Sequence, residues 1–272
     1  ASESIGTFRR FVERHNPTLL RYEHVPRLVD VAQRVVDGTL SRVIVMLTPG
    51  YFKTEVFSRL LPAYFLRRHP DRHVGLLSYG AELAWSISED ARDRYVEDGG
   101  ALSVVTKAKK RWRTAARGSM WAAGFGGPSL GFRFDLGVVD DPVDPDQAHS
   151  LIGMRRFQSR WPAKFLSRQR PGARIVFVMQ RLGTMDPIDF LFRREVGEDT
   201  DLAPEHWHVV VCDEVKSDEP LGRWDGPQGL PSTCTIEADP RSRGDVLAPT
   251  HLDYDQVIRI QQASGPYVTA AQ

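Results

Sequence analysis

The chain has 272 residues and a formal net charge of +1, with 26% charged and 41% hydrophobic residues. That length is enough for one large α/β domain, or one domain with a small appendage, which permits an enzyme. No apolar run approaches the ~20 residues of a membrane span and no secretory leader opens the chain, so we expect a soluble protein with no membrane partner.

The predicted elements alternate between helices and strands. Residues 8–36 carry apolar positions at helical spacing, and Gly38 then provides a stop. Residues 43–47 form a continuous apolar run, typical of a strand buried on both faces, and a helical pattern follows. Strands are also predicted at 73–78, 136–139, 174–179 and 206–212, with helical stretches at 82–95 and 155–165. This alternation predicts an α/β fold with a mostly parallel sheet covered on both faces.

The last part of the chain has a different texture. Residues 217–243 are rich in Gly, Pro, Asp and Ser with little periodicity, which predicts a loop or hinge region. A short helix is expected at 253–263. Cys212 and Cys234 are interpreted as free thiols.

A candidate phosphate-binding loop follows the strand at 43–47. Such a loop needs backbone N–H groups at a helix N-terminus, a lysine for the phosphates and a Ser or Thr for Mg²⁺, and Lys53 and Thr54 suit these two roles. Leu47 and Phe52 stand where the pattern GxxxxGK(S/T) has its two glycines. The alternative interpretation is a Lys-Thr pair that opens an ordinary amphipathic helix.

Two adjacent carboxylates follow another predicted strand. Asp140 lies at the C-terminal tip of a buried strand, where a Mg²⁺–nucleotide site in an open α/β sheet is expected, and Asp141 is then placed to orient or deprotonate water. The alternative for Asp-Asp-Pro is a turn that simply ends a strand. A Lys-Thr loop at the end of a second buried strand favours the magnesium site.

Four sequence blocks occur in a recognisable order: RVIVMLTPGYFKTE, VGLLSYGAELAWSISEDAR, GSMWAAGFGGPSLGFRFDLGVVDDPVDPDQAHS and GARIVFVMQRLGTMDPIDFL. This order resembles the large terminase subunits of tailed phages. The resemblance implies a P-loop NTPase fold of the additional-strand class, in which ATP hydrolysis with Mg²⁺ drives double-stranded DNA into a procapsid. It also implies a portal protein and a small terminase subunit as partners, and a homo-oligomeric ring on the procapsid formed by a chain that is a monomer in isolation. The location would be the host cytoplasm, with transient docking at the portal.

The resemblance also implies a division of the chain and a set of site residues. Residues 1–40 would be a helical segment on the adenine side, 41–213 the ATPase core and 214–272 a lid or hinge subdomain; the family's nuclease domain would lie outside this chain, so no DNA cleavage is expected. By position, Asp140 would bind Mg²⁺ together with Thr54. The expected nucleotide contacts are Thr48, Pro49, Gly50, Tyr51, Phe52, Lys53, Thr54 and Glu55, with Tyr22 and His24 at the adenine.

Charge neutralisation in the transition state needs a further cation. The arginine often found inside the family's loop is missing here, and Phe52 replaces the glycine before the lysine, which predicts a distorted or collapsed empty loop. Arg133 and Arg181 are the candidates for a catalytic arginine acting in a neighbouring subunit, and the alternative is that both pair with surface carboxylates. Gln180, Arg181 and Asp186 match the block that couples hydrolysis to DNA movement.

Two other clusters have simpler interpretations. Six basic residues lie close to Trp112 and could grip phosphates, but a solvated surface segment between strands is the preferred interpretation. They are Lys107, Lys109, Lys110, Arg111, Arg113 and Arg117. His206 and His208 share one strand face but have no convincing third zinc ligand. Two further functions stay open for the chain: a helicase-like P-loop ATPase, and a degenerate P-loop module that binds DNA or portal.

Overall fold

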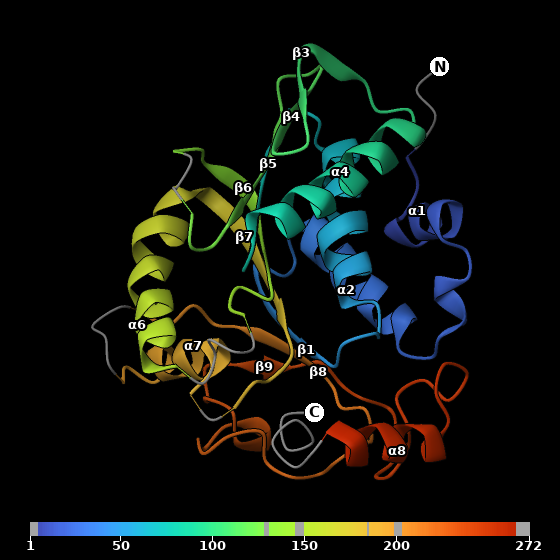
Figure 1. Cartoon of the computed structure of the whole chain (residues 1–272), viewed down its shortest axis with the longest axis vertical. Coiled ribbons are helices and arrows are strands. Elements are labelled where there is room, and N and C mark those ends of the chain that lie inside the picture. Colours follow the sequence, from blue (N-terminus) through green and yellow to red (C-terminus); the bar gives the residue numbers. More distant parts are fainter. Residues whose placement is uncertain (1–4, 128–130, 145–149, 184, 199–202, 265–272) are drawn as a thin grey trace.

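The structure is a computed structural model that describes residues 5–127, 131–144, 150–183, 185–198 and 203–264. Within these residues a single mixed sheet of nine strands runs through the molecule, in the order β3-β4-β5-β2-β6-β7-β1-β8-β9 (Figure 1). The strands are β1 Arg42–Leu47, β2 His73–Ser78, β3 Leu102–Ala108, β4 Arg111–Thr114, β5 Ser119–Gly124, β6 Phe134–Asp140, β7 Gln169–Met179, β8 His208–Cys212 and β9 Thr235–Ile236.

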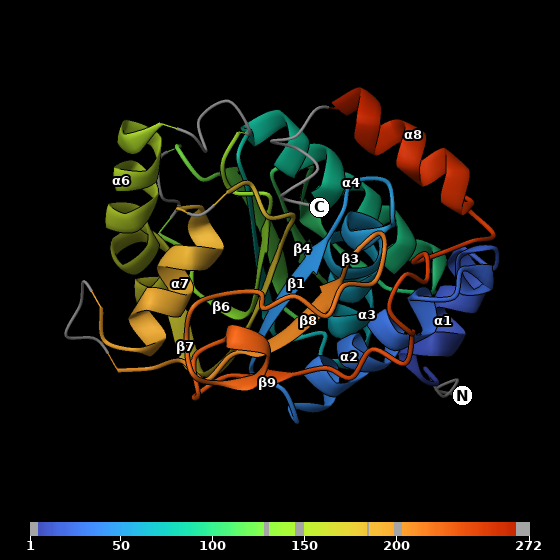
Figure 2. The same ribbon diagram turned by 90° about the horizontal axis from the view of Figure 1, so that it is seen from below.

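Helices cover both faces of the sheet. Figures 1 and 2 show α1 to α4 on one face and α6 and α7 on the other, with α8 beyond the end of β8. The α-helices are α1 Phe8–His15, α2 Val25–Asp37, α3 Leu61–Arg68, α4 Ala81–Glu97, α6 Leu151–Arg160, α7 Pro187–Glu195 and α8 Tyr254–Ser264. Shorter helical turns are η1 Leu19–Arg21, η2 Glu55–Leu60, η3 Trp161–Phe165, η4 Leu166–Arg168 and η5 Pro227–Gly229; η2 and η3 are π-helical.

The strand order defines the class of the fold. Strands β5, β2, β6, β7, β1, β8 and β9 pair in parallel, whereas β3 and β4 are antiparallel additions at one edge. Strand β7 lies between β1, which leads into the Lys-Thr loop, and β6, which ends at Asp140. The predicted α/β fold, with a mostly parallel central sheet flanked by helices, is therefore confirmed.

Two hydrophobic clusters fill the spaces between the sheet and its two helical layers. Alternate residues of β1 point to opposite faces, so Val43 and Val45 join the cluster under α1 to α4, while Ile44 and Met46 join the cluster under α6 and α7. This explains the continuous apolar run: a strand covered on both faces has no solvent side. The central strands are thereby held firmly, and their ends give fixed positions to the loops that follow.

Most predicted elements are confirmed, and the differences lie at the sheet edges. Three strands between 102 and 124 were missed, and the basic segment near Trp112 is part of β3, β4 and their turn instead of a loop between strands. The predicted loop at 217–243 contains β9, which extends the main sheet beside β8. Both cysteines are free and buried. None of the described helices is at once long and apolar enough to cross a membrane.

The three-part division of the chain stays a prediction. Residues 214–264 supply β9 and α8, and Val215 bridges to Val246, so this segment lies partly in the sheet and partly beyond it. Residues 265–272 of the expected lid lie outside the described residues.

Candidate nucleotide site

The Lys-Thr loop runs from the end of β1 into η2, and its backbone is left-handed at two residues. Gly50 has φ of +86° and Phe52 has φ of +68°. A side chain at this φ costs roughly 1–2 kcal/mol, because its Cβ approaches the following carbonyl oxygen. Phe52 thus adopts a conformation that is cheap only for glycine, at the position where the phosphate-loop pattern has one.

Lys53 faces the tip of β6. Its ammonium nitrogen is 3.4 Å from Oδ2 of Asp141, and Lys53 is only 6% exposed. The backbone of Asp141 is anchored on both sides, since its N–H donates to the carbonyl of Val178 and its own carbonyl accepts from the N–H of Tyr79. Strands β2, β6 and β7 together therefore hold Asp141 beside the loop, where its carboxylate is the counter-ion of the lysine.

Asp140 is a buried carboxylate whose oxygens have no well-formed hydrogen bond within the described part of the chain, although the hydroxyls of Ser58 and Thr54 lie close enough to affect its charge. It is 2% exposed, and neither of its oxygens has a hydrogen-bond partner in the described residues. Burial, with help from the charge of Asp141, raises the pKa of Asp140 to about 6, although the hydroxyls of Ser58 and Thr54 and the charge of Lys53 oppose the shift. Burial also raises the pKa of Asp141, against the effect of Lys53. The negative charge of the two carboxylates is thus only partly balanced by Lys53, as in a site that binds a cation.

The donor set suits one kind of metal. Among the described residues, no group of three or more His, Cys, Asp or Glu could hold an ion by itself. Mg²⁺ differs from other metals here, because it commonly binds through one or two protein oxygens plus water and substrate phosphates. The unpartnered oxygens of Asp140 and the nearby hydroxyl of Thr54 fit that pattern, so these two residues would hold a nucleotide-borne Mg²⁺.

The two residues expected at the adenine lie in different environments. Tyr22 is half-buried and stacks on Phe52, with ring centroids 4.6 Å apart. His24 is buried, and its Nε2 donates to the carbonyl of Tyr51 at 3.0 Å. Burial lowers the pKa of His24 to about 4, which keeps the ring neutral near pH 7. His24 therefore stabilises the backbone of the loop through the carbonyl of Tyr51. Of the two residues, Tyr22 is the one whose side chain is partly accessible.

Sequence reasoning missed the residues that cover the loop from the C-terminal side. The ring of His251 lies 5.4 Å from each of the rings of Tyr22, Tyr51 and Phe52. The hydroxyl of Tyr51 donates to the buried Glu214 at 3.0 Å. Neither contact could be found from sequence, since about 160 to 230 positions separate the partners and no local spacing joins them.

The two candidate arginines lie at different ends of the sheet. Arg181 follows β7 on the same edge as the loop, but its Nε donates to the buried Asp186 at 2.8 Å and its Nη2 to the carbonyl of Gly183. Arg133 precedes β6, so it lies about 20 Å along the strand from Asp140. Arg133 therefore lies at the opposite end of β6 from the nucleotide site of its own chain. Whether either residue acts on a neighbouring subunit stays a prediction.

Other predicted residues have structural partners. Asp186 accepts from the N–H groups of Leu182 and Asp189, so it caps α7 while holding Arg181. His208 contacts Glu237 through Nε2 and Thr235 through Nδ1. These contacts tie β8 to the β9 region.

No protein-family model matches the chain, and no curated protein sequence matches it. Among solved structures, the chain is similar to the large terminase from a thermophilic bacteriophage in complex with ADP, at 9% sequence identity and a TM-score of 0.42. The match covers 66% of this chain and 44% of that protein, so the chain spans less than half the length of this relative.

Proposed function

We propose that the chain binds ATP with Mg²⁺ where β1 and β6 end, and hydrolyses it. Lys53 would meet the β- and γ-phosphates, Thr54 and Asp140 would hold the metal, and Asp141 would accept a proton from the attacking water. The bound Mg²⁺ would supply charge neutralisation at the phosphate oxygens.

The buried Asp140 is the single observation that carries this proposal. A carboxylate with two unpartnered oxygens is costly in a protein interior unless it serves a cation. It lies beside a hydroxyl, a lysine and a second carboxylate that come from two different strand ends. Lys53 and Asp141 pair with each other here, and each would take a different role when a nucleotide binds. When Lys53 turns to a phosphate, Asp141 loses its counter-ion and becomes free to act as a base.

The motor function is a further part of the proposal. We infer that hydrolysis powers the movement of double-stranded DNA into a procapsid, with portal protein and a small terminase subunit as partners in a homo-oligomeric ring. Support comes from the order of the four sequence blocks that resemble large terminase subunits. A helicase-like translocase would use the same site. Stimulation by procapsids that carry portal, without stimulation by single strands, favours packaging.

The test of hydrolysis is ATP turnover by the purified chain and by Lys53→Ala. We expect the variant to fold normally and to lose about 100-fold or more in turnover, because no other cation of the loop can meet the phosphates. Lys164→Ala, which removes a lysine that donates to the carbonyl of Gly127, is the matched control and should keep full turnover. Equal turnover in Lys53→Ala and the parent chain would contradict the assignment.

One observation favours a second candidate, a module that binds without hydrolysis. Phe52 has a left-handed backbone within the loop, and Lys53 is already engaged by Asp141. If the parent chain binds ATP weakly and has no turnover on portal either, the non-catalytic module is the better assignment.

A further inference from the structure

The edge of the sheet where the parallel strands begin, opposite the nucleotide site, gathers arginines from separate chain segments. Arg113 on β4 pairs with Ser119 on β5, and Ser119 pairs with His73 on β2. Paired residues share a face of the sheet, which the hydrogen bond of 2.9 Å between Nδ1 of His73 and the hydroxyl of Ser119 confirms. Arg113 is exposed, so its charge reaches solvent above this row.

The alternation of β4 fixes the direction of its arginines. Trp112 is fully buried on the α4 side, where its indole N–H contacts Ser88. Arg111 and Arg113 must then point to the other face. The guanidinium of Arg111 lies 3.9 Å from the ring centroid of Phe132, and its Nε has no hydrogen-bond partner in the described residues.

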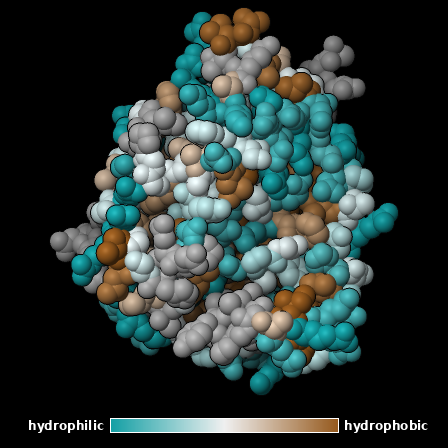
Figure 3. Space-filling view, in the orientation of Figure 1, coloured by the Kyte–Doolittle hydropathy of each residue, from teal (hydrophilic) through white to brown (hydrophobic). Residues whose placement is uncertain are grey.

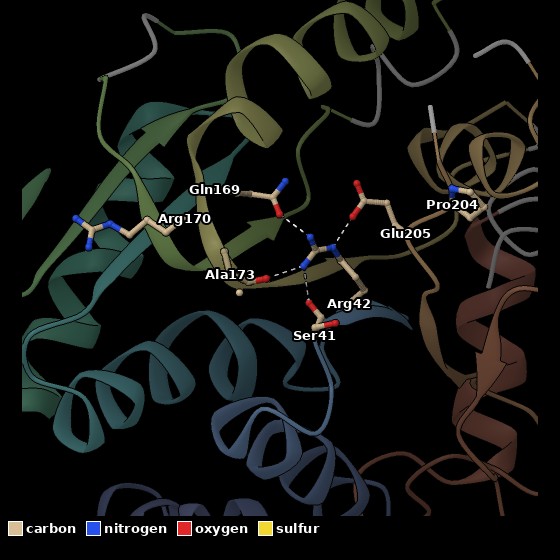
Figure 4. Close-up of a pocket in the computed structure, with 8 residues that line it drawn as sticks. Ser41, Arg42, Gln169, Arg170, Ala173, Pro204 and Glu205 are labelled. Atoms are coloured by element: carbon tan, nitrogen blue, oxygen red, sulfur yellow. Dashed lines mark hydrogen bonds and ion pairs between the residues drawn. The ribbon is translucent and has the colours of Figure 1, made fainter. Parts of the chain in front are cut away.

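Arg170 adds a charge from the start of β7. Figure 4 shows that its side chain points away from the neighbouring Arg42. Arg42 is fully engaged in a pocket of about 330 Å³, where it contacts Glu205, Gln169 and two backbone carbonyls (Figure 4). The Nε of Arg170, in contrast, has no partner in the part of the chain that the structure describes.

The guanidinium groups of Arg111, Arg113 and Arg170 have no carboxylate partner among the described residues. Burial lowers the pKa of His73, and the charges of Arg170, Arg111 and Arg113 lower it further. The carboxylate in the same group is Asp135, and it is already engaged by Arg72 at 2.9 Å and by the N–H of His73. No ion pair joins Arg111, Arg113 or Arg170 to a carboxylate among the described residues.

The two helices of this face do not extend to β3 and β4 (Figure 1). Figure 1 shows β4 and β3 extending beyond α6 and α7, which cover the same face farther along the sheet. From β4 to β7 there are four strand spacings, about 19 Å in all, and successive phosphates of one DNA strand are ~3.4 Å apart along the helix axis. A row of this length can contact several phosphates of one duplex.

We propose that Arg111, Arg113 and Arg170 form a binding surface for the phosphate backbone of double-stranded DNA. The inference deepens the proposed motor function, because it names the face that would hold the DNA. Duplex is favoured over single strands because base stacking needs exposed aromatic rings. Here Trp112 and Trp121 are buried and Phe132 lies under Arg111. The surface therefore offers positive charge without stacking rings, which suits duplex DNA, where the phosphates are accessible and the bases are paired.

The test is the salt dependence of binding between the purified chain, without nucleotide, and a fluorescent duplex of about 30 base pairs, long enough to span the row of arginines. Each lost phosphate contact should reduce the slope of log K against log salt by about 1, and should weaken binding roughly tenfold near 0.1 M salt. We therefore expect Arg113→Gln with Arg170→Gln to reduce the slope by about 2. Arg113→Lys should keep most of the slope, because a single positive charge suffices for a phosphate.

Matched controls remove charge or apolar surface elsewhere. Arg10→Gln and Arg259→Gln delete exposed arginines of α1 and α8 and should leave the slope unchanged. Val104→Ser with Val105→Ser changes the exposed apolar tip of β3, at 88% and 85% exposure, where Figure 3 shows hydrophobic side chains at the top of the molecule. That variant should also bind duplex normally.

Three outcomes would overturn the inference: unchanged duplex binding in Arg113→Gln with Arg170→Gln, equal losses in the control arginine variants, or a loss confined to single strands. Failure of the proposed ATPase is distinguishable from these outcomes. Lys53→Ala should bind duplex like the parent chain, so an inactive ATP site leaves the duplex measurement intact.

Discussion

The charged side chains at the two edges of the parallel sheet differ in burial and in pairing. Where the strands end, Lys53 and Asp140 are buried, and the half-buried Asp141 lies 3.4 Å from the ammonium nitrogen of Lys53. Where the strands begin, Arg113 is exposed and Arg170 is half-buried, and neither has a carboxylate partner among the described residues. One edge is therefore suited to a small ligand that replaces internal contacts, and the other to a long polyanion.

This difference has a physical origin. Buried charges interact strongly because little water screens them, so moving one proton or one ion changes the energy of the whole group. Exposed arginines interact weakly with each other, and their combined field acts at long range and falls with salt. Substitutions at the first edge should consequently change chemistry and pH dependence, whereas substitutions at the second should change salt dependence.

The largest effect should come from Asp141→Asn at the buried edge. We expect turnover to fall about 10²- to 10⁴-fold, the usual range for loss of a positioned base. ATP binding should persist or tighten, because Lys53 no longer has to leave a carboxylate at 3.4 Å to reach the phosphates. Turnover and equilibrium binding of a fluorescent ATP analogue would be measured in parallel. A variant that loses binding as strongly as turnover would contradict the role of Asp141 as a base.

A smaller effect is expected from Asp140→Asn, which should raise the free energy of unfolding above that of the parent chain. The folded pKa of Asp140 is about 6, above the ordinary 3.8, so between these values the folded state binds the extra proton. Stability from this group is therefore highest at or below pH values of about 4 and declines as pH rises to about 6. A shift of this size corresponds to about 3 kcal/mol.

Asp140→Asn should thus be more stable than the parent chain by up to about 3 kcal/mol at a pH of about 7.5, and nearly equal to it at a pH of about 4. Urea unfolding at both pH values measures the difference. Asp30→Asn on α2, where the side chain is exposed, is the control and should show little difference at either pH. A stability gain that does not change with pH would mean that Asp140 is ionised at no unusual cost.

The sequence predicted the buried edge well because its chemistry follows local rules. Lys53 and Asp140 each follow a continuous apolar run, and the ends of parallel strands meet at one edge of a sheet. The amino edge was harder to predict. Arg111 and Arg113 belong to a basic segment that the sequence shows directly, but Arg170 lies far along the chain, and only the strand order brings it to the same edge of the sheet.

The strands near Arg111 were missed for a related reason. Strand β3 has a register irregularity between Leu102 and Lys107, and Val104 and Val105 are both exposed, so the alternation that marks a strand is broken there. The contacts of Glu214 and His251 with the loop are likewise tertiary. Periodicity reports which side of an element is buried, and it carries no information about distant partners.

The smallest expected effect concerns the strain at Phe52, which bears on whether the buried edge is set up for a ligand. Phe52→Gly removes both the ring that stacks on Tyr22 and the Cβ that disfavours φ of +68°, whereas Phe52→Ala removes the ring and keeps the Cβ. The glycine variant should therefore be more stable than the alanine variant by about 1 kcal/mol, the reverse of their order at an ordinary position. Chemical unfolding of both variants gives this difference directly. If the alanine variant is equally or more stable, Phe52 does not hold a left-handed backbone in solution, and strain cannot explain weak nucleotide binding.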